Sequence, residues 1–98
     1  MATATDHADY CADLVRHADR ARFLSALYAP EPARGHLYAL YAFDAEIAKI
    51  GDIVHEPMAG EIRLQWWRDV IAGERDSEAM ANPLAAALLA AMRPASLI

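Results

Sequence analysis

The sequence has little cysteine, fewer positive than negative charges and no long apolar run. Each of these shortages argues against a class of protein. Cys11 is the single cysteine among 98 residues, so no internal disulfide can form and a reducing compartment is expected. Nine basic residues oppose fourteen acidic ones and form no basic cluster along the chain, which argues against nucleic-acid binding. The longest nearly apolar run, residues 83–92, is shorter than the ~20 residues that span a bilayer. We therefore expect a cytoplasmic protein without nucleic-acid partner or transmembrane segment, and leave peripheral membrane contact open.

Several targeting and catalytic motifs are missing as well. Residues 1–10 lack the features of a secretory signal, and no arginine precedes Arg16, as a transit peptide would require. The four glycines form no phosphate-binding loop, and no serine lies in a GxSxG motif. The histidines do not have the spacing of a zinc site; they are His7, His17, His36 and His55. Sequence motifs alone therefore identify no catalytic residue.

Helical periodicity is present along nearly the whole chain, whereas the alternating pattern of strands is not. We predict an all-α fold with five helices, at about residues 6–19, 20–28, 32–56, 60–73 and from 83 to the proline at 94, with a polar loop at 74–82. Pro30 and Pro32 separate the second helix from the third. Asn82 is expected to cap the fifth helix, with Pro83 at its first position.

The core is predicted from apolar spacing within these helices. The expected core residues outside the third helix are Tyr10, Cys11, Leu14, Val15 and His17 in the first helix, Phe23, Leu24 and Leu27 in the second, Ile62, Trp66, Trp67, Val70 and Ile71 in the fourth, and Leu84, Leu88, Leu89 and Met92 in the fifth. Because Trp66 and Trp67 are adjacent, we expect one of them in the core and the other at an interface.

The third helix is apolar on most of its sides. Its main stripe is Leu40, Phe43, Ile47, Ile50 and Val54, and Leu37, Tyr38, Tyr41 and Ile53 widen it. Such a helix is normally buried among several neighbours, more than 98 residues supply. Together with a hydrophobic content of 56% and an apolar C-terminal end, this predicts that the chain is a fragment of a larger helical domain and is marginally stable alone.

Three acids interrupt this apolar helix: Asp44, Glu46 and Asp52. Asp44 and Asp52 are eight residues apart, roughly 12 Å along a helix, too far for one magnesium ion with ligands at ~2.1 Å to bridge. One interpretation is that the acids line a polar seam or pair with Lys49, Arg34 or Arg63. The other is that they contribute to a metal site.

Two segments carry a family resemblance. LYALYAF at residues 37–43, the acid-bearing helix after it, and LQWWRD at 64–69 resemble the squalene/phytoene synthase family of prenyl-diphosphate condensing proteins. The resemblance implies that residues 1–98 are the N-terminal third of a single domain, with the core match at about 10–71. The implied architecture is the N-terminal helices of a trans-isoprenyl diphosphate synthase-like helical bundle.

The departures from the family pattern ALYAFCRxxDDxxD affect its chemistry. Ala48 and Lys49 stand where the family has two adjacent aspartates, Asp52 matches the last one, and Ala45 replaces an arginine. Upstream, Ala21 and Arg22 replace a Ser-Phe pair. In active relatives such carboxylates hold Mg²⁺, which neutralises a diphosphate leaving group. The resemblance implies a degenerate first aspartate-rich motif, with substrate-binding candidates Tyr41, Phe43, Asp44, Asp52, Trp67 and Arg68, and with Asp52 a metal ligand only in an active enzyme.

A narrower resemblance covers residues 10–16, 42–48 and 60–67, which are similar to a branch of the family that includes a mitochondrial complex I assembly factor. It implies a non-catalytic helper without cofactor, whose partner is a respiratory-complex subunit, a prenyl diphosphate or another lipid. Two alternatives stay open. One is a condensing transferase of isoprenoid biosynthesis, using Mg²⁺ with Asp44, Asp52 and a downstream motif. The other is a helical interaction fragment with no function of its own.

Overall fold

The computed structural model describes residues 3–31, 33–52 and 57–93, and within these ranges all regular structure is helical. The helices are α1 (Ala4–Ala18), α2 (Arg20–Ala26), α3 (Ala33–Asp52), α4 (Pro57–Ile71), α5 (Asp76–Met80) and α6 (Pro83–Met92). The predicted all-α class is confirmed. The third helix was predicted to extend to about residue 56, but residues 53–56 lie outside the described part of the chain.

Side-chain caps explain where three helices begin. Thr3 and Asp6 form a capping box in which the Thr3 hydroxyl accepts from the Asp6 amide at 3.2 Å and the Asp6 carboxylate accepts from the Thr3 amide at 3.0 Å. Asp19 ends α1 and caps α2, accepting from the Arg22 amide at 3.1 Å. Asn82 accepts from the Ala85 amide at 3.1 Å, with Pro83 in the first turn of α6. The predicted start of this helix is confirmed.

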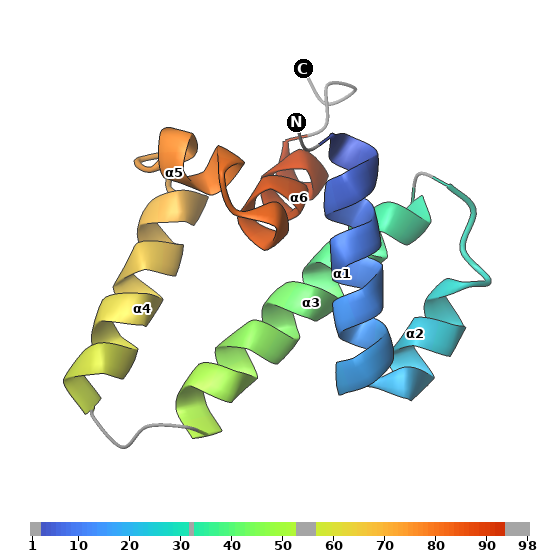
Figure 1. Cartoon of the computed structure of the whole chain (residues 1–98), viewed down its shortest axis with the longest axis horizontal. Coiled ribbons are helices and arrows are strands. Elements are labelled where there is room, and N and C mark those ends of the chain that lie inside the picture. Colours follow the sequence, from blue (N-terminus) through green and yellow to red (C-terminus); the bar gives the residue numbers. More distant parts are fainter. Residues whose placement is uncertain (1–2, 32, 53–56, 94–98) are drawn as a thin grey trace.

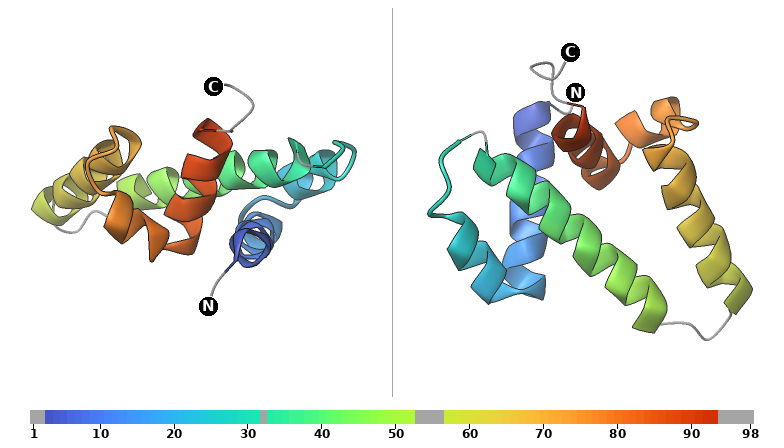
Figure 2. Two further views of the ribbon diagram at one scale, coloured as in Figure 1. Left: turned by 90° about the horizontal axis from the view of Figure 1, so that it is seen from above. Right: turned by 180° about the vertical axis from the view of Figure 1, so that it is seen from behind.

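Helices α1, α3 and α6 pack against one another and form the centre of the molecule (Figure 1). α6 crosses α3 next to α1, while α2 and α4 lie at opposite ends of the molecule (Figure 2). α2 contacts α1 and the first part of α3, and α4 contacts α3. The short helix α5 connects α4 to α6 and packs against α6.

The core combines alanines with a few large side chains. Its members are Cys11, Val15, Ala26, Tyr38, Ala42, Trp67, Val70, Ala79, Leu84, Ala85, Leu88 and Leu89. Burial of the predicted residues Cys11, Val15, Trp67, Val70, Leu84, Leu88 and Leu89 is therefore confirmed. Eight other core predictions are wrong, because these side chains are exposed: Tyr10, His17, Leu24, Leu27, Leu40, Ile62, Ile71 and Met92.

The buried side of α3 differs from the predicted stripe. Tyr38, Ala39 and Ala42 are buried, whereas Leu40 is 46% exposed. Small alanine side chains let α1 and α6 approach α3 closely, so the contact forms at alanines rather than at the largest apolar residues. Phe43, Ile47 and Ile50 are half-buried and pack against the edge of the core. The described helices therefore leave part of the apolar surface of α3 uncovered, in line with the expectation that this chain alone supplies too few neighbours for it.

The predicted loop at residues 74–82 contains the short helix α5. Arg75 donates to Glu78 at 2.9 Å and to Asp69 at 3.3 Å, which ties α5 to the end of α4. Ala79 is fully buried on the inner side of this turn. Gly73 has a φ of +85°, a left-handed conformation that favours glycine and lets the chain reverse after α4. This polar segment is therefore partly helical because Ala79 is buried and Arg75 forms ion pairs with Asp69 and Glu78.

Cys11 is fully buried on α1, and burial raises the pKa of its thiol to about 11. At pH 8, only about one such thiol in a thousand is a thiolate, the nucleophilic form. We expect Ellman's reagent to leave the folded protein unmodified over a period in which guanidinium-denatured protein reacts completely. A folded protein that reacts as fast as the denatured one would contradict the packing of α1.

Candidate functional site

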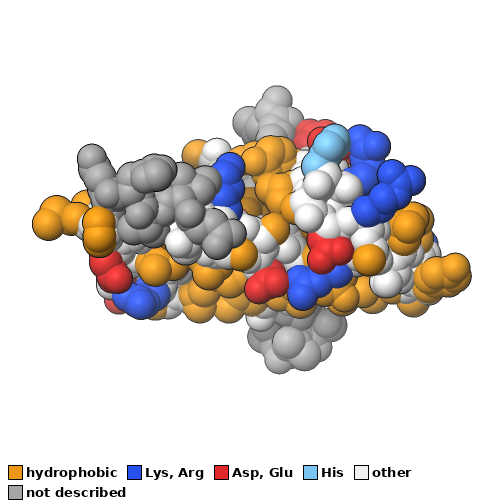
Figure 3. All heavy atoms as spheres, turned by 90° about the horizontal axis from the view of Figure 1, so that it is seen from below, with side chains coloured by type: hydrophobic (Ala, Val, Ile, Leu, Met, Phe, Trp, Pro, Cys, Tyr) orange, Lys and Arg blue, Asp and Glu red, His pale blue; other side chains and the backbone are white. Residues whose placement is uncertain are grey.

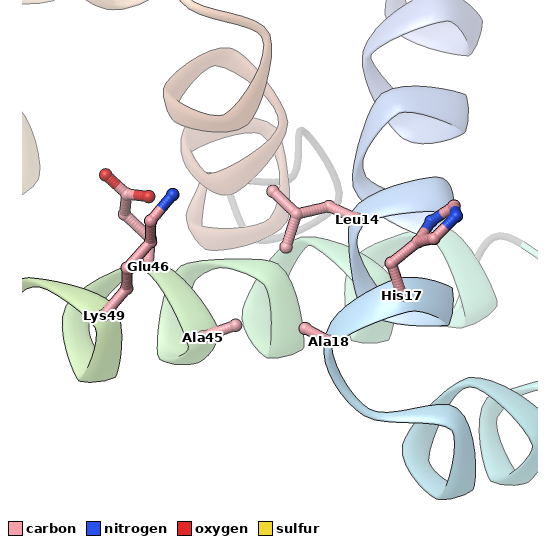
Figure 4. Close-up of a pocket in the computed structure, with 6 residues that line it drawn as sticks. All are labelled: Leu14, His17, Ala18, Ala45, Glu46 and Lys49. Atoms are coloured by element: carbon pink, nitrogen blue, oxygen red, sulfur yellow. The ribbon is translucent and has the colours of Figure 1, made fainter. Parts of the chain in front are cut away.

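Two adjoining hollows lie between the C-terminal half of α1 and the middle of α3. The larger, of about 360 Å³, is lined by Leu14, His17, Ala18, Ala45, Glu46 and Lys49. The smaller, of about 220 Å³, is lined by Val15, Ala18, Asp19, Arg22, Tyr41, Asp44, Ala45 and Ala48. They share Ala18 and Ala45. In Figure 4, side chains from α1 form one side of the larger hollow and side chains from α3 form the other.

The residues that replace the family's charged motif line these hollows. Ala45 borders both, Ala48 borders the smaller and Lys49 borders the larger. Because residues three and four apart share a helix face, all three belong to the α3 surface that faces α1. This surface offers methyl groups and one ammonium where the family pattern has an arginine and two carboxylates.

Asp44 is bound by an arginine of another helix. The Arg22 guanidinium donates to the Asp44 carboxylate at 2.7 Å, lies 3.5 Å from Asp19, and sits over the Tyr41 ring at 5.0 Å from its centroid. The hydrogen bond to Asp44 holds the pKa of Arg22 above its ordinary value. Sequence reasoning proposed other partners for Asp44, and no spacing rule links residues that are 22 positions apart. The one available signal was that Arg22 replaces an aromatic residue of the family pattern.

Glu46 also pairs with an arginine. Arg63 of α4 donates to its carboxylate at 3.1 Å, which confirms Arg63 as a partner of these acids. Arg34, another partner considered, instead donates to the backbone carbonyl of Ala29 at 3.1 Å. The two described acids of α3 therefore connect this helix to α2 and to α4.

The other predicted binding residues do not meet at one place. Tyr41 lines the smaller hollow. Phe43 packs edge-on against Trp67, with ring centroids 5.1 Å apart, and Trp67 packs against Trp66 at 4.9 Å. The structure therefore brings Tyr41 and Asp44 together and places Phe43 and Trp67 in the packing of α4 against α3.

Two further candidates are Arg68 and Asp52. Arg68 is exposed, with its guanidinium 3.4 Å from the Gln65 side-chain oxygen. Asp52 is the last residue of α3, and its side chain lies outside the described residues. Neither Arg68 nor Asp52 is among the described residues that line the two hollows.

The described residues of α3 do not fit a magnesium ion. Mg²⁺ takes oxygen ligands in a compact octahedron, but the oxygens of Asp44 and Glu46 are held by two arginines on opposite neighbours of the helix. Between these acids and the end of α3 stand Ala48, which has no donor atom, and Lys49, whose ammonium repels a cation. The described side chains of α3 therefore support no metal-dependent step.

The family assignment follows from a sequence comparison. The model of the squalene/phytoene synthase family matches residues 15–98, which include α2 to α6 and every residue that lines the hollows except Leu14. The chain belongs to the squalene/phytoene synthase family. This membership confirms the resemblance carried by LYALYAF and LQWWRD and agrees with the all-helical structure.

Individual relatives match the chain only in part of their own length. A Homo sapiens protein named NADH dehydrogenase (ubiquinone) complex I, assembly factor 6 is 37% identical over 70 residues, covering 71% of this chain and 20% of the relative. The Bos taurus protein of that name is 34% identical over 92 residues, or 94% of this chain and 27% of the relative. The Rattus norvegicus protein is 36% identical over 62 residues, or 63% and 19%. The chain thus spans about a fifth to a quarter of these relatives.

No solved structure matches the chain significantly. Among the helices of the described residues, none is both long enough and apolar enough to cross a membrane.

Proposed function

We propose that the chain belongs to a non-catalytic protein that retains the helices of the squalene/phytoene synthase fold as a binding scaffold. The observation that supports this most strongly is the pairing of Asp44 with Arg22 and of Glu46 with Arg63. Both carboxylates connect helices. Ala48 and Lys49 stand at the positions of the family's paired aspartates. The scaffold in this proposal requires no metal or other cofactor.

The proposed partner is a subunit of a respiratory complex, and the proposed role is to help in its assembly. The support is the name that the mammalian relatives carry, complex I assembly factor 6, at 34–37% identity to this chain. A prenyl diphosphate or another lipid, bound by the same scaffold, is the alternative partner that we propose. We also propose a cytoplasmic location, which is one of the reducing compartments that a single cysteine without an internal disulfide partner fits.

Two measurements test the proposal in the complete gene product. Deletion of the gene should lower the amount of assembled complex I on native gels, and the Asp52→Ala variant should restore it as well as the unchanged gene does. A scaffold does not depend on this one carboxylate, whereas an enzyme that uses it as a metal ligand would. Normal complex I in the deletion strain, or failure of a folded Asp52→Ala protein, would contradict the proposal.

The second measurement addresses catalysis directly. Purified protein with farnesyl or geranylgeranyl diphosphate and Mg²⁺ should form no condensed hydrocarbon product. Formation of squalene- or phytoene-type product at many turnovers would overturn the non-catalytic role in favour of the transferase. A tagged protein recovered with organelles would contradict only the cytoplasmic location.

A further inference from the structure

We draw no further inference here: the strongest candidate, the surface patch of Leu24, Leu27 and Tyr28 on the outer side of α2 at one end of the molecule (Figure 3), rests on exposed apolar side chains alone, and nothing in the described part of the chain shows what covers them.

Discussion

Replacing Trp67 with alanine is expected to lower the free energy of unfolding by about 3–5 kcal/mol, the usual cost of removing a buried large aromatic side chain. Trp67 is 2% exposed and joins Phe43 of α3 to Trp66 of α4 through two edge-on ring contacts. Its loss leaves a cavity where α4 meets α3. A loss of this size is a large part of the stability of a small domain, so urea denaturation of Trp67→Ala should begin at little or no denaturant.

Trp67→Phe is the matched control for this experiment. The indole Nε1 of Trp67 is buried and has no hydrogen-bond partner among the described residues. Phenylalanine keeps most of the packed surface and removes this unsatisfied donor, whose burial costs about 1–3 kcal/mol. We therefore expect Trp67→Phe to retain most of the stability. If Trp67→Ala were as stable as Trp67→Phe, the aromatic cluster would not be the contact that holds α4.

Restoring carboxylates at Ala48 and Lys49 is expected to create a magnesium-dependent response that the natural protein lacks. Ala48 borders the smaller hollow and Lys49 the larger, so Ala48→Asp and Lys49→Asp together place two acids on the surface facing α1. They also remove the ammonium that repels a cation. At a ligand concentration roughly a hundred times its Kd, binding stabilises a protein by about 2.7 kcal/mol. Differential scanning fluorimetry of the complete gene product should show a rise of several degrees with Mg²⁺ plus a prenyl diphosphate.

The control for this variant replaces the same two residues with asparagine, which has a similar shape and no negative charge. Ala48→Asn with Lys49→Asn should show no response to Mg²⁺ and diphosphate. A natural protein that already gains thermal stability from the two ligands would contradict the non-catalytic proposal. Asp44 and Asp52 would then be the first residues to replace.

The sequence predicted the start of a helix well where one or two residues determine it. Asn82 followed by Pro83 has the side chain and the backbone geometry of a helix start, and α6 begins there. The sequence did not reveal α5, because a five-residue helix has too few turns for a recognisable periodicity. α5 depends on burial of Ala79 and on ion pairs of Arg75 with Asp69 and Glu78, which are contacts made only after folding.

Longer-range features were predicted less well, for a physical reason. A prediction from apolar spacing favours large side chains, and it therefore placed Leu40 in the core of α3. In the structure Ala39 and Ala42 are buried instead, because small side chains let the neighbouring helices approach closely. The family motif gave a better prediction, because its fixed spacing assigns each residue of this segment to a position of the family pattern. It identified Ala45, Ala48 and Lys49 as a group, and the structure places them on the hollow walls. The Arg22–Asp44 pair depends on how α2 turns at Asp19, which no pattern along the chain encodes.

The one-sided attachment of α4 has a consequence for how the molecule opens. α4 packs through Trp67 and Val70, while Met58 and Ile62 on its outer side are 76% and 66% exposed. α1, α3 and α6, in contrast, all contact one another. Proteins open in cooperative units, and the unit with the fewest buried apolar contacts opens at the lowest free energy. α4 can therefore detach while α1, α3 and α6 stay packed on one another, and such an opening would remove Trp67 and Val70 from the core and uncover Phe43 on α3.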